Sequence, residues 1–254
     1  ILSKIFQKFF LSASLIFQSE RKRSRQNSTP SNIIAVGFIA LVKSRSKSIV
    51  VGVAGGTGAG KSTIVKEILK QLGTEKVSVI QHDSYYKNRP ELSFEERTKI
   101  NFDHPDSLET NLLVEHLNLL ISGKNVEIPV FHHFTKYLRD SSTKKVESRP
   151  ILIVEGILVL NDKELRDLMN LKVFIDVPPD LRFIRRLKRD LSEHGRSVES
   201  VTKQYLATIR TMHEEYVEPS KIYADVFIPE GWSNRQAVNL LVSHLQTLQE
   251  KHFS

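Results

Sequence analysis

The segment GGTGAGKS, residues 55–62, constrains the fold of this chain more than any other stretch. It matches the pattern G-x-x-x-x-G-K-[ST] and lies between a predicted buried strand, SIVVGVAG, and a predicted helix, KSTIVKEILKQL. The glycines let consecutive backbone N–H groups surround phosphate oxygens, and the helix N-terminus adds partial positive charge. Lys61 can reach the β- and γ-phosphates, and the Ser62 hydroxyl can ligate Mg²⁺. The segment predicts a nucleoside triphosphate site, since the dinucleotide pattern G-x-G-x-x-G fits these glycines in no register.

Apolar strand patterns alternate with helical patterns along residues 49–254. Further strands are predicted at residues 76–81, 150–160, 172–177 and 224–229. Helices are predicted at residues 108–121, 178–193, 198–217 and 234–249. Such alternation is typical of a parallel sheet flanked by helices. The segment PILIVEGILVL has the nearly continuous apolar character of a central parallel strand. The sequence therefore predicts an α/β fold, a three-layer P-loop fold with a mostly parallel central sheet.

The net charge of +8 comes from residues 1–48, which hold nine Lys and Arg residues and one acidic residue, Glu20. Residues 49–254 hold 28 basic and 28 acidic residues, so this part carries no net charge and we expect no nucleic-acid partner. The chain has no Cys, which excludes disulfides, thiolate metal sites and a Cys nucleophile.

Residues 1–48 are interpreted as a basic N-terminal extension, separate from a domain at residues 49–254, and we expect the extension to be poorly ordered. Its acid-poor composition with Ser and Arg fits a transit peptide for an organelle. There are two alternatives. The segment is a surface or membrane-associating helix, or it is an extension that is no part of the functional protein. Its apolar stretch IIAVGFIALV is too short to span a bilayer. For the domain we expect a cytoplasmic location and no membrane partner.

Two acidic residues and a group of cations accompany the predicted phosphate site. Asp83 ends the second predicted strand, and functional groups of parallel sheets gather at the carboxyl ends of strands. A carboxylate there can accept a hydroxyl proton or help to hold Mg²⁺, or it can simply form a turn. Glu155 lies inside an apolar run, where metal ligation offsets the cost of burying its charge. Six cations on one predicted helix and its exit form either a solvated face or a lid over phosphates: Arg182, Arg185, Arg186, Lys188, Arg189 and Arg196.

Six segments together resemble the uridine (uridine–cytidine) kinase family. They are GVAGGTGAGKST, QHDSYYKN, INFDHPDSLE, VEGILVL, KRDLSEHGRS and EPSKIYADVFIP, in the family's order and at its spacing, and the resemblance covers about residues 49–250. It implies transfer of the γ-phosphate of ATP or GTP to the 5′-hydroxyl of uridine or cytidine, with Mg²⁺. It also implies a helical lid, a small β flap near residues 125–148, a small-molecule nucleoside as partner, and a homo-oligomer, namely a tetramer.

The resemblance assigns roles position by position. Asp83 resembles the family's catalytic base, acting with Lys61 and Arg189, while Ser62, Glu155 and Asp83 resemble its metal site. The residues expected to bind the phosphate donor are Gly55, Gly56, Thr57, Gly58, Ala59, Gly60, Lys61, Ser62, Thr63 and His194. The residues expected to bind the nucleoside are Phe102, Asp103, Phe134, Tyr137, Arg186, Arg196 and Gln204. Many relatives have Arg in place of His194.

The segment PVFHHFTKYLR, residues 129–139, departs from the family pattern P-x-Y-[DS]-[FY]-x-x-H-x-R by one additional residue. When the two are aligned on Arg139, Phe134 takes the second aromatic position and His133 the Asp/Ser position. Tyr137 takes the place of the family's His, and Phe131 or His132 takes the first aromatic position. A zinc site at the two histidines is disfavoured, because adjacent side chains of an extended chain point to opposite faces. Glu230 in IPEG likewise replaces a cation, so the departures concern base recognition rather than phosphate chemistry.

Two alternatives to a uridine or cytidine kinase stay open at this point. One is a related kinase on the same scaffold, similar to phosphoribulokinase or pantothenate kinase, although NFDHPDS and GRSVESVTKQY favour the nucleoside kinase. The other is a catalytically weak nucleotide-binding regulatory protein, which the altered segment at residues 129–139 allows. The intact Lys61, Ser62, Asp83 and Glu155 argue against the second alternative.

Overall fold

The structure, a computed structural model, describes residues 48–133 and 135–253. The expectations about the N-terminal extension therefore lie outside the described residues, apart from Ser48. Phe134 lies outside them as well. In the part of the chain that is described, no helix is both long enough and apolar enough to cross a bilayer.

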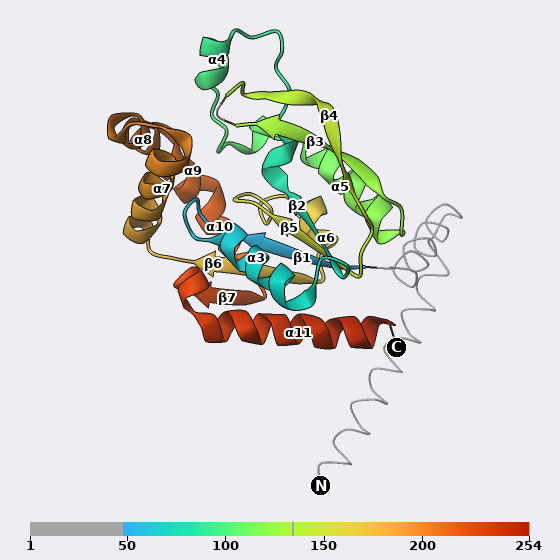
Figure 1. The fold of residues 1–254 in the computed structure, drawn as a ribbon. Coiled ribbons are helices and arrows are strands. Elements are labelled where there is room, and N and C mark those ends of the chain that lie inside the picture. The colour runs from blue at the N-terminus through green and yellow to red at the C-terminus, as the bar shows by residue number, and fades with distance from the viewer. Residues whose placement is uncertain (1–47, 134, 254) are drawn as a thin grey trace, which may run out of the picture. The chain divides into compact units, whose positions relative to one another are not determined.

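The centre of the fold is a five-stranded parallel sheet (Figure 1). Its strands are β1 (Ile49–Ala54), β2 (Val77–Gln81), β5 (Ile151–Glu155), β6 (Leu171–Asp176) and β7 (Val226–Pro229). The strand order is β2-β5-β1-β6-β7, so β2 and β7 form the two edges and β1 lies in the middle. All residues of β1 and β5 are buried. The continuous apolar runs in the sequence predict this burial for central parallel strands.

Helices cover both faces of this sheet, because alternate residues of each strand point to opposite sides. On one face, Val50 and Leu152 pack with the buried side of α5 (Thr110–Ile121). On the other face, Val51 and Ile153 pack with α3 (Lys61–Leu72) and α11 (Arg235–Phe253). The short helix α6 (Lys163–Asp167) joins the first of these cores through Leu165. The predicted three-layer α/β arrangement is thereby confirmed.

A separate antiparallel hairpin projects from the carboxyl side of the sheet and is called the flap, residues 126–146 (Figure 1). It consists of β3 (Val126–His132) and β4 (Leu138–Val146), with a register shift between Pro129 and Phe131. The short helix α4 (Phe94–Thr98) lies near its tip and starts with a capping box between Ser93 and Glu96. Further single 3₁₀ turns occur at His82–Tyr85, Pro105–Ser107, Lys221–Tyr223 and Gly231–Ser233.

The lid comprises α7 (Pro179–His194) and the helical segment that follows it, residues 198–220. The sequence predicts one continuous helix at residues 198–217, but the structure interrupts it twice. Helices α8 (Val198–Gln204), α9 (Arg210–Met212) and α10 (Glu218–Ser220) are separated by π-helical turns at Tyr205–Ile209 and His213–Val217. The second turn ends two residues before Pro219, which has no N–H for a helical hydrogen bond. Such π turns are frequent near functional sites, and this one places His213 behind the phosphate loop.

Candidate active site

A cavity of about 740 Å³ lies at the carboxyl ends of the strands, between the phosphate loop, the flap and the lid. It brings together most of the residues that the sequence analysis predicts to bind substrates or to act in catalysis. These are Thr57, Gly58, Gly60, Lys61, Ser62, Thr63, Asp83, Phe102, Asp103, Tyr137, Glu155, Arg186, Arg189, His194, Arg196 and Gln204. Gly55, Gly56 and Ala59 are buried in the loop and do not line the cavity. The two ends of the cavity are therefore a phosphate-binding loop and a group of aromatic and acidic side chains.

The phosphate loop, residues 55–62, has the backbone shape that a phosphate cradle requires. Gly58 has a φ of 77° and Gly60 a φ of 93°, conformations that favour glycine, and a Cβ on Gly58 would collide with the carbonyl oxygen of Arg182. The Lys61 Nζ donates to the carbonyl oxygens of Gly55 at 3.0 Å and Gly56 at 3.3 Å. Burial lowers the pKa of Lys61 to about 8, although the charges of Glu155 and Asp83 oppose this. The Lys61 ammonium group thus lies against the backbone of the phosphate loop, where the phosphates of a nucleotide would bind.

Glu155 ends β5 with its side chain buried, at 5% exposure, next to the start of α3. The Ser62 hydroxyl lies 3.0 and 3.1 Å from its two carboxylate oxygens, and the amide of Gln81 donates to Oε1 at 3.1 Å. The charge of this carboxylate acts on Lys61, where it opposes the lowering of the Lys61 pKa by burial. A hydroxyl and a buried carboxylate are oxygen donors that suit a hard cation such as Mg²⁺.

No group of three or more His, Asp or Glu side chains that could hold a metal ion occurs among the described residues, this site included. A cation at Ser62 and Glu155 would therefore have few protein ligands. This fits Mg²⁺, which commonly keeps several waters and uses substrate phosphates as ligands. The donor set at this end of the cavity is consistent with the predicted metal site, with Asp83 lining the same cavity.

Asp83 lies in the 3₁₀ turn that directly follows β2, with its carboxylate about half exposed in the cavity. His133 of the flap approaches it, with Nε2 3.8 Å from Asp83 Oδ2. The neighbouring His132 points away and pairs with Asp140 at 2.6 Å, which holds the pKa of Asp140 well below its usual range. The two adjacent histidines thus have different surroundings, since His132 pairs within the flap and His133 lies in the cavity. Only His133 contributes to the cavity.

The rings at the flap end of the cavity form one cluster. Tyr86 contacts the edges or faces of Phe102 at 4.9 Å, Phe131 at 5.2 Å and His133 at 5.7 Å between centroids. Tyr137, with a φ of 50°, stacks on Phe102 at 5.6 Å and an interplanar angle of 19°. Of the two candidates for the first aromatic position of the family pattern, Phe131 lines the cavity and has no hydroxyl.

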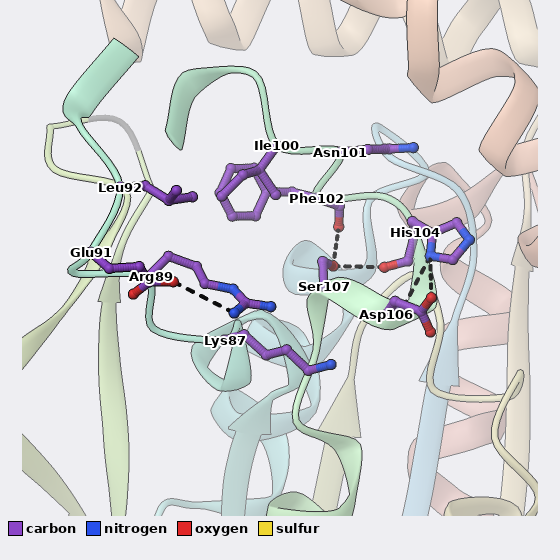
Figure 2. A pocket seen from close by; sticks show the side chains of 10 residues that line it. All are labelled: Lys87, Arg89, Glu91, Leu92, Ile100, Asn101, Phe102, His104, Asp106 and Ser107. Atoms are coloured by element: carbon purple, nitrogen blue, oxygen red, sulfur yellow. Dashed lines mark hydrogen bonds and ion pairs between the residues drawn. The ribbon is translucent and has the colours of Figure 1, made fainter. Parts of the chain in front are cut away.

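The loop at residues 101–107 carries Asp103 and is held by its own hydrogen bonds, as Figure 2 shows. The Ser107 hydroxyl lies 3.1 Å from the carbonyl oxygen of Phe102 and 2.6 Å from that of His104. Behind the loop is a second pocket of about 580 Å³, in which Phe102 forms the wall shared with the main cavity. Burial raises the pKa of the Asp103 carboxyl, and the charges of Arg186 and Lys61 oppose this rise. Asp103 therefore lies on a hydrogen-bonded loop at the cavity, where the charges of Arg186 and Lys61 act on its carboxylate.

Arg139 joins the flap to the turn that follows β2 and to the residue before α5. Arg139 donates to the carbonyl oxygens of Tyr86 at 3.0 Å and Tyr85 at 3.3 Å, and to the Glu109 carboxylate at 2.8 Å. The sequence alignment used Arg139 only as a reference position. The structure shows why an arginine is suited to it, since a planar group with several donors can bridge backbone and carboxylate at once.

The lid contributes a polar network with Asp190 at its centre. The Asp190 side chain has 0% exposure, and its carboxylate lies 3.4 Å from Arg186, 2.8 Å from Arg189 and 3.3 Å from Arg196. Gln204 Oε1 accepts from Arg196 at 2.7 Å and from Arg186 at 3.1 Å. Arg186 also donates to the Thr57 hydroxyl of the phosphate loop at 2.9 Å. The sequence selected the arginines and Gln204 but not the carboxylate that orients them.

Several residues of the site were not selected from the sequence, among them Asp190, Arg182 and Trp232. Asp190 had a signal, since it is the one acid inside the basic segment RRLKRD, where an acidic residue can pair with several cations. Arg182 was only counted among the lid cations, yet it is buried and donates to the carbonyl oxygen of Val177 at 3.0 Å. Trp232, which also lines the cavity, had no motif to mark it.

Comparison with known proteins places this site in a family. The profile of the Phosphoribulokinase / Uridine kinase family matches residues 50–237. A relative from Streptococcus gordonii named uridine kinase is 45% identical over 204 residues, which cover 80% of this chain and 97% of the relative. One of the same name from Streptococcus thermophilus is 46% identical over 205 residues, 81% of this chain and 97% of the relative. The solved phosphoribulokinase of Rhodobacter spheroides has a TM-score of 0.55 at 16% identity, covering 72% of this chain and 70% of its own, which supports the fold alone. This chain is a kinase of the phosphoribulokinase / uridine kinase family.

Proposed function

We propose that this protein transfers the γ-phosphoryl group of ATP or GTP to the 5′-hydroxyl of uridine or cytidine, giving UMP or CMP. The observation that carries the proposal is one cavity in which a phosphate loop faces a pocket of rings and a fixed carboxylate. The relatives named uridine kinase support the acceptor, because their similarity to this chain spans 97% of their length.

The phosphate loop binds the triphosphate of the donor in this proposal. Its backbone N–H groups and the N-terminus of α3 face the phosphate oxygens, and Lys61 neutralises charge on the β- and γ-phosphates. Ser62 and Glu155, with Asp83 nearby, would hold Mg²⁺. When bound, Mg²⁺ supplies charge stabilisation to the transferring phosphoryl group.

Asp83 is the proposed general base, since its carboxylate lies in the cavity at the end of β2, next to the phosphate loop. It accepts the proton of the 5′-hydroxyl as that oxygen attacks the γ-phosphorus in line. Its side chain is about half exposed, and the Nε2 atom of His133 lies 3.8 Å from Oδ2 of its carboxylate. No residue of the chain forms a covalent bond to the phosphoryl group in this scheme.

Asp103 and the rings around it are proposed to orient the nucleoside. A carboxylate can accept hydrogen bonds from both ribose hydroxyls at once, so a deoxynucleoside should be a poorer acceptor. Phe102 and Tyr137 provide flat apolar surface for the sugar and base, and Arg196 and Gln204 provide polar groups for the base edge. Base recognition should therefore depend on side chains of the flap and the lid.

The lid residues Arg186, Arg189 and His194 are proposed to act at the sugar and the phosphates. All three line the cavity, and Arg186 already donates to Thr57 in the phosphate loop. Closure of the lid would exclude water from the transferring group, which matters because water would otherwise compete with the acceptor hydroxyl. The family resemblance also supports a homo-oligomer, which light scattering after size-exclusion chromatography tests.

The test is release of ADP from ATP and Mg²⁺ with four separate acceptors: uridine, cytidine, ribulose 5-phosphate and pantothenate. We expect turnover with at least one of the two nucleosides and background rates with the other two compounds. Turnover with neither nucleoside would overturn the proposal. Turnover with ribulose 5-phosphate or pantothenate alone would show that the protein is instead a kinase similar to phosphoribulokinase or pantothenate kinase.

A further inference from the structure

Trp232 lies in the cavity without a role in the proposed chemistry. It belongs to the turn at Gly231–Ser233, which follows β7, and its side chain is 44% exposed. A Cβ placed on Gly60 would lie 3.1 Å from Cδ1 of Trp232, so the indole lies directly against the phosphate loop. An exposed indole beside a phosphate cradle is an unused flat surface at the site of nucleotide binding.

The turn that presents Trp232 has a defined backbone. Glu230 and Gly231 both have positive φ, 63° and 67°, and a Cβ on Gly231 would collide with the carbonyl oxygen of Ala59. The Glu230 N–H donates to the carbonyl oxygen of Asp176 at 3.0 Å. The turn is therefore packed tightly against the phosphate loop and β6, and these contacts restrict the position of the indole.

The strand order determines which end of the donor reaches this indole. Asp83 follows the edge strand β2, the phosphate loop follows the central strand β1, and Trp232 follows the opposite edge strand β7. Four strand spacings of about 4.8 Å separate the two edges, or about 19 Å. The γ-phosphate has to lie on the β2 side, where Asp83 and Glu155 are. The rest of the donor then runs across the loop toward β7.

The aromatic rings of the cavity are distributed accordingly. Tyr86, Phe102, Phe131 and Tyr137 gather in the ring cluster on the flap side. Of the Phe, Tyr and Trp side chains that line the cavity in the described part of the chain, Trp232 alone lies on the β7 side. A nucleoside held in the ring cluster and a nucleotide held by the loop thus each have their own aromatic surface.

Arg185 adds a cation beside the indole. It projects from α7 into the same cavity, and its Nη2 lies 3.5 Å from the carbonyl oxygen of Glu230. Its Nη1 is buried and has no hydrogen-bond partner among the described residues. A buried donor without a partner is costly, so a ligand with an acceptor atom would be favoured here.

We propose that Trp232 and Arg185 form the subsite for the purine base of the phosphate donor. The base stacks on the indole, as bases stack on aromatic side chains of other proteins, and Arg185 donates to an acceptor atom of the base or its sugar. This inference rests on the donor half of the proposed function. It does not depend on which acceptor is phosphorylated.

The test uses the intrinsic fluorescence of the full chain, because Trp232 is the only tryptophan in the sequence. Titration with Mg²⁺·ATP in the absence of acceptor is expected to change the emission. Tripolyphosphate, which has no base, is expected to compete with ATP for the loop and to leave the emission unchanged. ATP that binds, as equilibrium dialysis measures, without any change in emission would overturn the subsite.

Steady-state kinetics provide the second measurement. Trp232→Ala is expected to raise KM for ATP about tenfold and to leave kcat within about twofold, since stacking supports binding rather than chemistry. Trp232→Phe should restore most of the affinity. Phe227→Ala is the matched control, because this aromatic on β7 is similarly exposed, at 47%, but lies outside the cavity. An unchanged KM for ATP in Trp232→Ala would overturn the inference.

The outcomes also separate this inference from the proposed function. An ATP-dependent emission change without phosphorylation of uridine or cytidine supports the subsite and overturns the acceptor assignment. Phosphorylation of uridine with an unchanged KM for ATP in Trp232→Ala supports the acceptor and overturns the subsite. Absence of any ATP binding overturns both.

Discussion

The phosphate loop follows a strand whose six residues are all buried, whereas the flap ends in β4, where residues 141–145 are all exposed. The loop is proposed to act through backbone N–H groups and through Lys61, which is hydrogen-bonded to the loop itself. The flap is proposed to act through side chains, and Arg139 and a group of rings attach it to the segment that follows β2. A change in the loop therefore disturbs the core of the fold, but a change in the flap alters mainly what the pocket recognises.

This contrast explains where the chain departs from its family. Backbone geometry at residues 55–62 requires particular glycines, so the phosphate motif is kept complete. The additional residue expected in the flap fits a two-stranded hairpin, which can absorb it at a register shift such as the one between Pro129 and Phe131. Catalysis should accordingly be sensitive to the sheet end of the cavity, and substrate choice to the flap.

The largest expected effect is on the sheet side, from Asp83→Asn. An amide cannot accept the hydroxyl proton, so kcat should fall about 10³-fold or more, within the range that general bases contribute. The affinity for ATP, measured by equilibrium dialysis, should be nearly unchanged because the phosphate loop is intact.

The matched control for Asp83→Asn is Asp106→Asn, which removes an exposed carboxylate on the nearby 101–107 loop. Its kcat should remain within about twofold of the wild type, since surface substitutions away from special features usually have small effects. Near-wild-type turnover in Asp83→Asn would contradict the assignment of the base. It would also contradict the view that catalysis depends on the sheet end of the cavity and substrate choice on the flap.

The next largest effect is expected from Asp190→Asn in the lid. The substitution leaves three arginines without their shared, fully buried carboxylate. Removing one partner of a buried ion pair costs about 3–5 kcal/mol, so the free energy of unfolding in urea should fall by about 4 kcal/mol. Asp180→Asn, an exposed acid at the start of the same helix, should cost no more than about 1 kcal/mol. Equal losses in both variants would show that Asp190 has no special structural role.

The sequence predicted the sheet side of the site more completely than the flap side. The parallel strands, the phosphate loop and the strand-end positions of Asp83 and Glu155 follow from local pattern and from the rule that such ends converge. The contacts of Asp190 did not follow, because they depend on how α7 and the segment at residues 196–204 fold back on each other. The same holds for Trp232, which reaches the phosphate loop only because β7 pairs with β6.

The π-helical turns and the flap register were also beyond local reasoning. The helical pattern at residues 198–217 predicts helix correctly, but an additional residue in a turn leaves the pattern nearly unchanged. In the flap, counting from Arg139 gave one register, yet the pocket position of His133 depends on the irregularity between Pro129 and Phe131. Long-range packing decided both features.

A pH-dependent loss of stability is expected from His213, which supports the phosphate loop from behind. Its Nε2 lies 2.9 Å from Nη2 of the buried Arg182 and 3.4 Å from the Glu218 carboxylate. Burial, followed by the charge of Arg182, lowers the pKa of His213 from 6.5 to about 4. Between about pH 4 and pH 6.5, residue 213 therefore binds a proton in the unfolded chain but not in the folded protein. The stability that neutral His213 provides is complete above about pH 6.5 and is lost as pH falls to about 4.

The measurement is urea unfolding of the wild type and His213→Gln between pH 4 and pH 8. A shift of this size corresponds to about 3 kcal/mol over the window, so the variant should show a shallower decline by roughly that amount. Burial also lowers the pKa of His82 to about 4, so some decline should persist in the variant. Identical slopes in the two proteins would show that His213 is not responsible.

The smallest effect is expected on the flap, from Tyr137→His. Tyr137 stacks on Phe102 in the cavity with a φ of 50°, a left-handed conformation in which His is more common than most residues. The imidazole should therefore be accommodated without loss of stability and can hydrogen-bond the base edge. One additional neutral hydrogen bond lowers KM for uridine or cytidine about threefold, with kcat unchanged. Tyr137→Phe, which keeps the stack and lacks any such group, is the matched control. An unchanged KM in Tyr137→His would mean that residue 137 does not face the base edge, and that the flap meets the nucleoside in a different register.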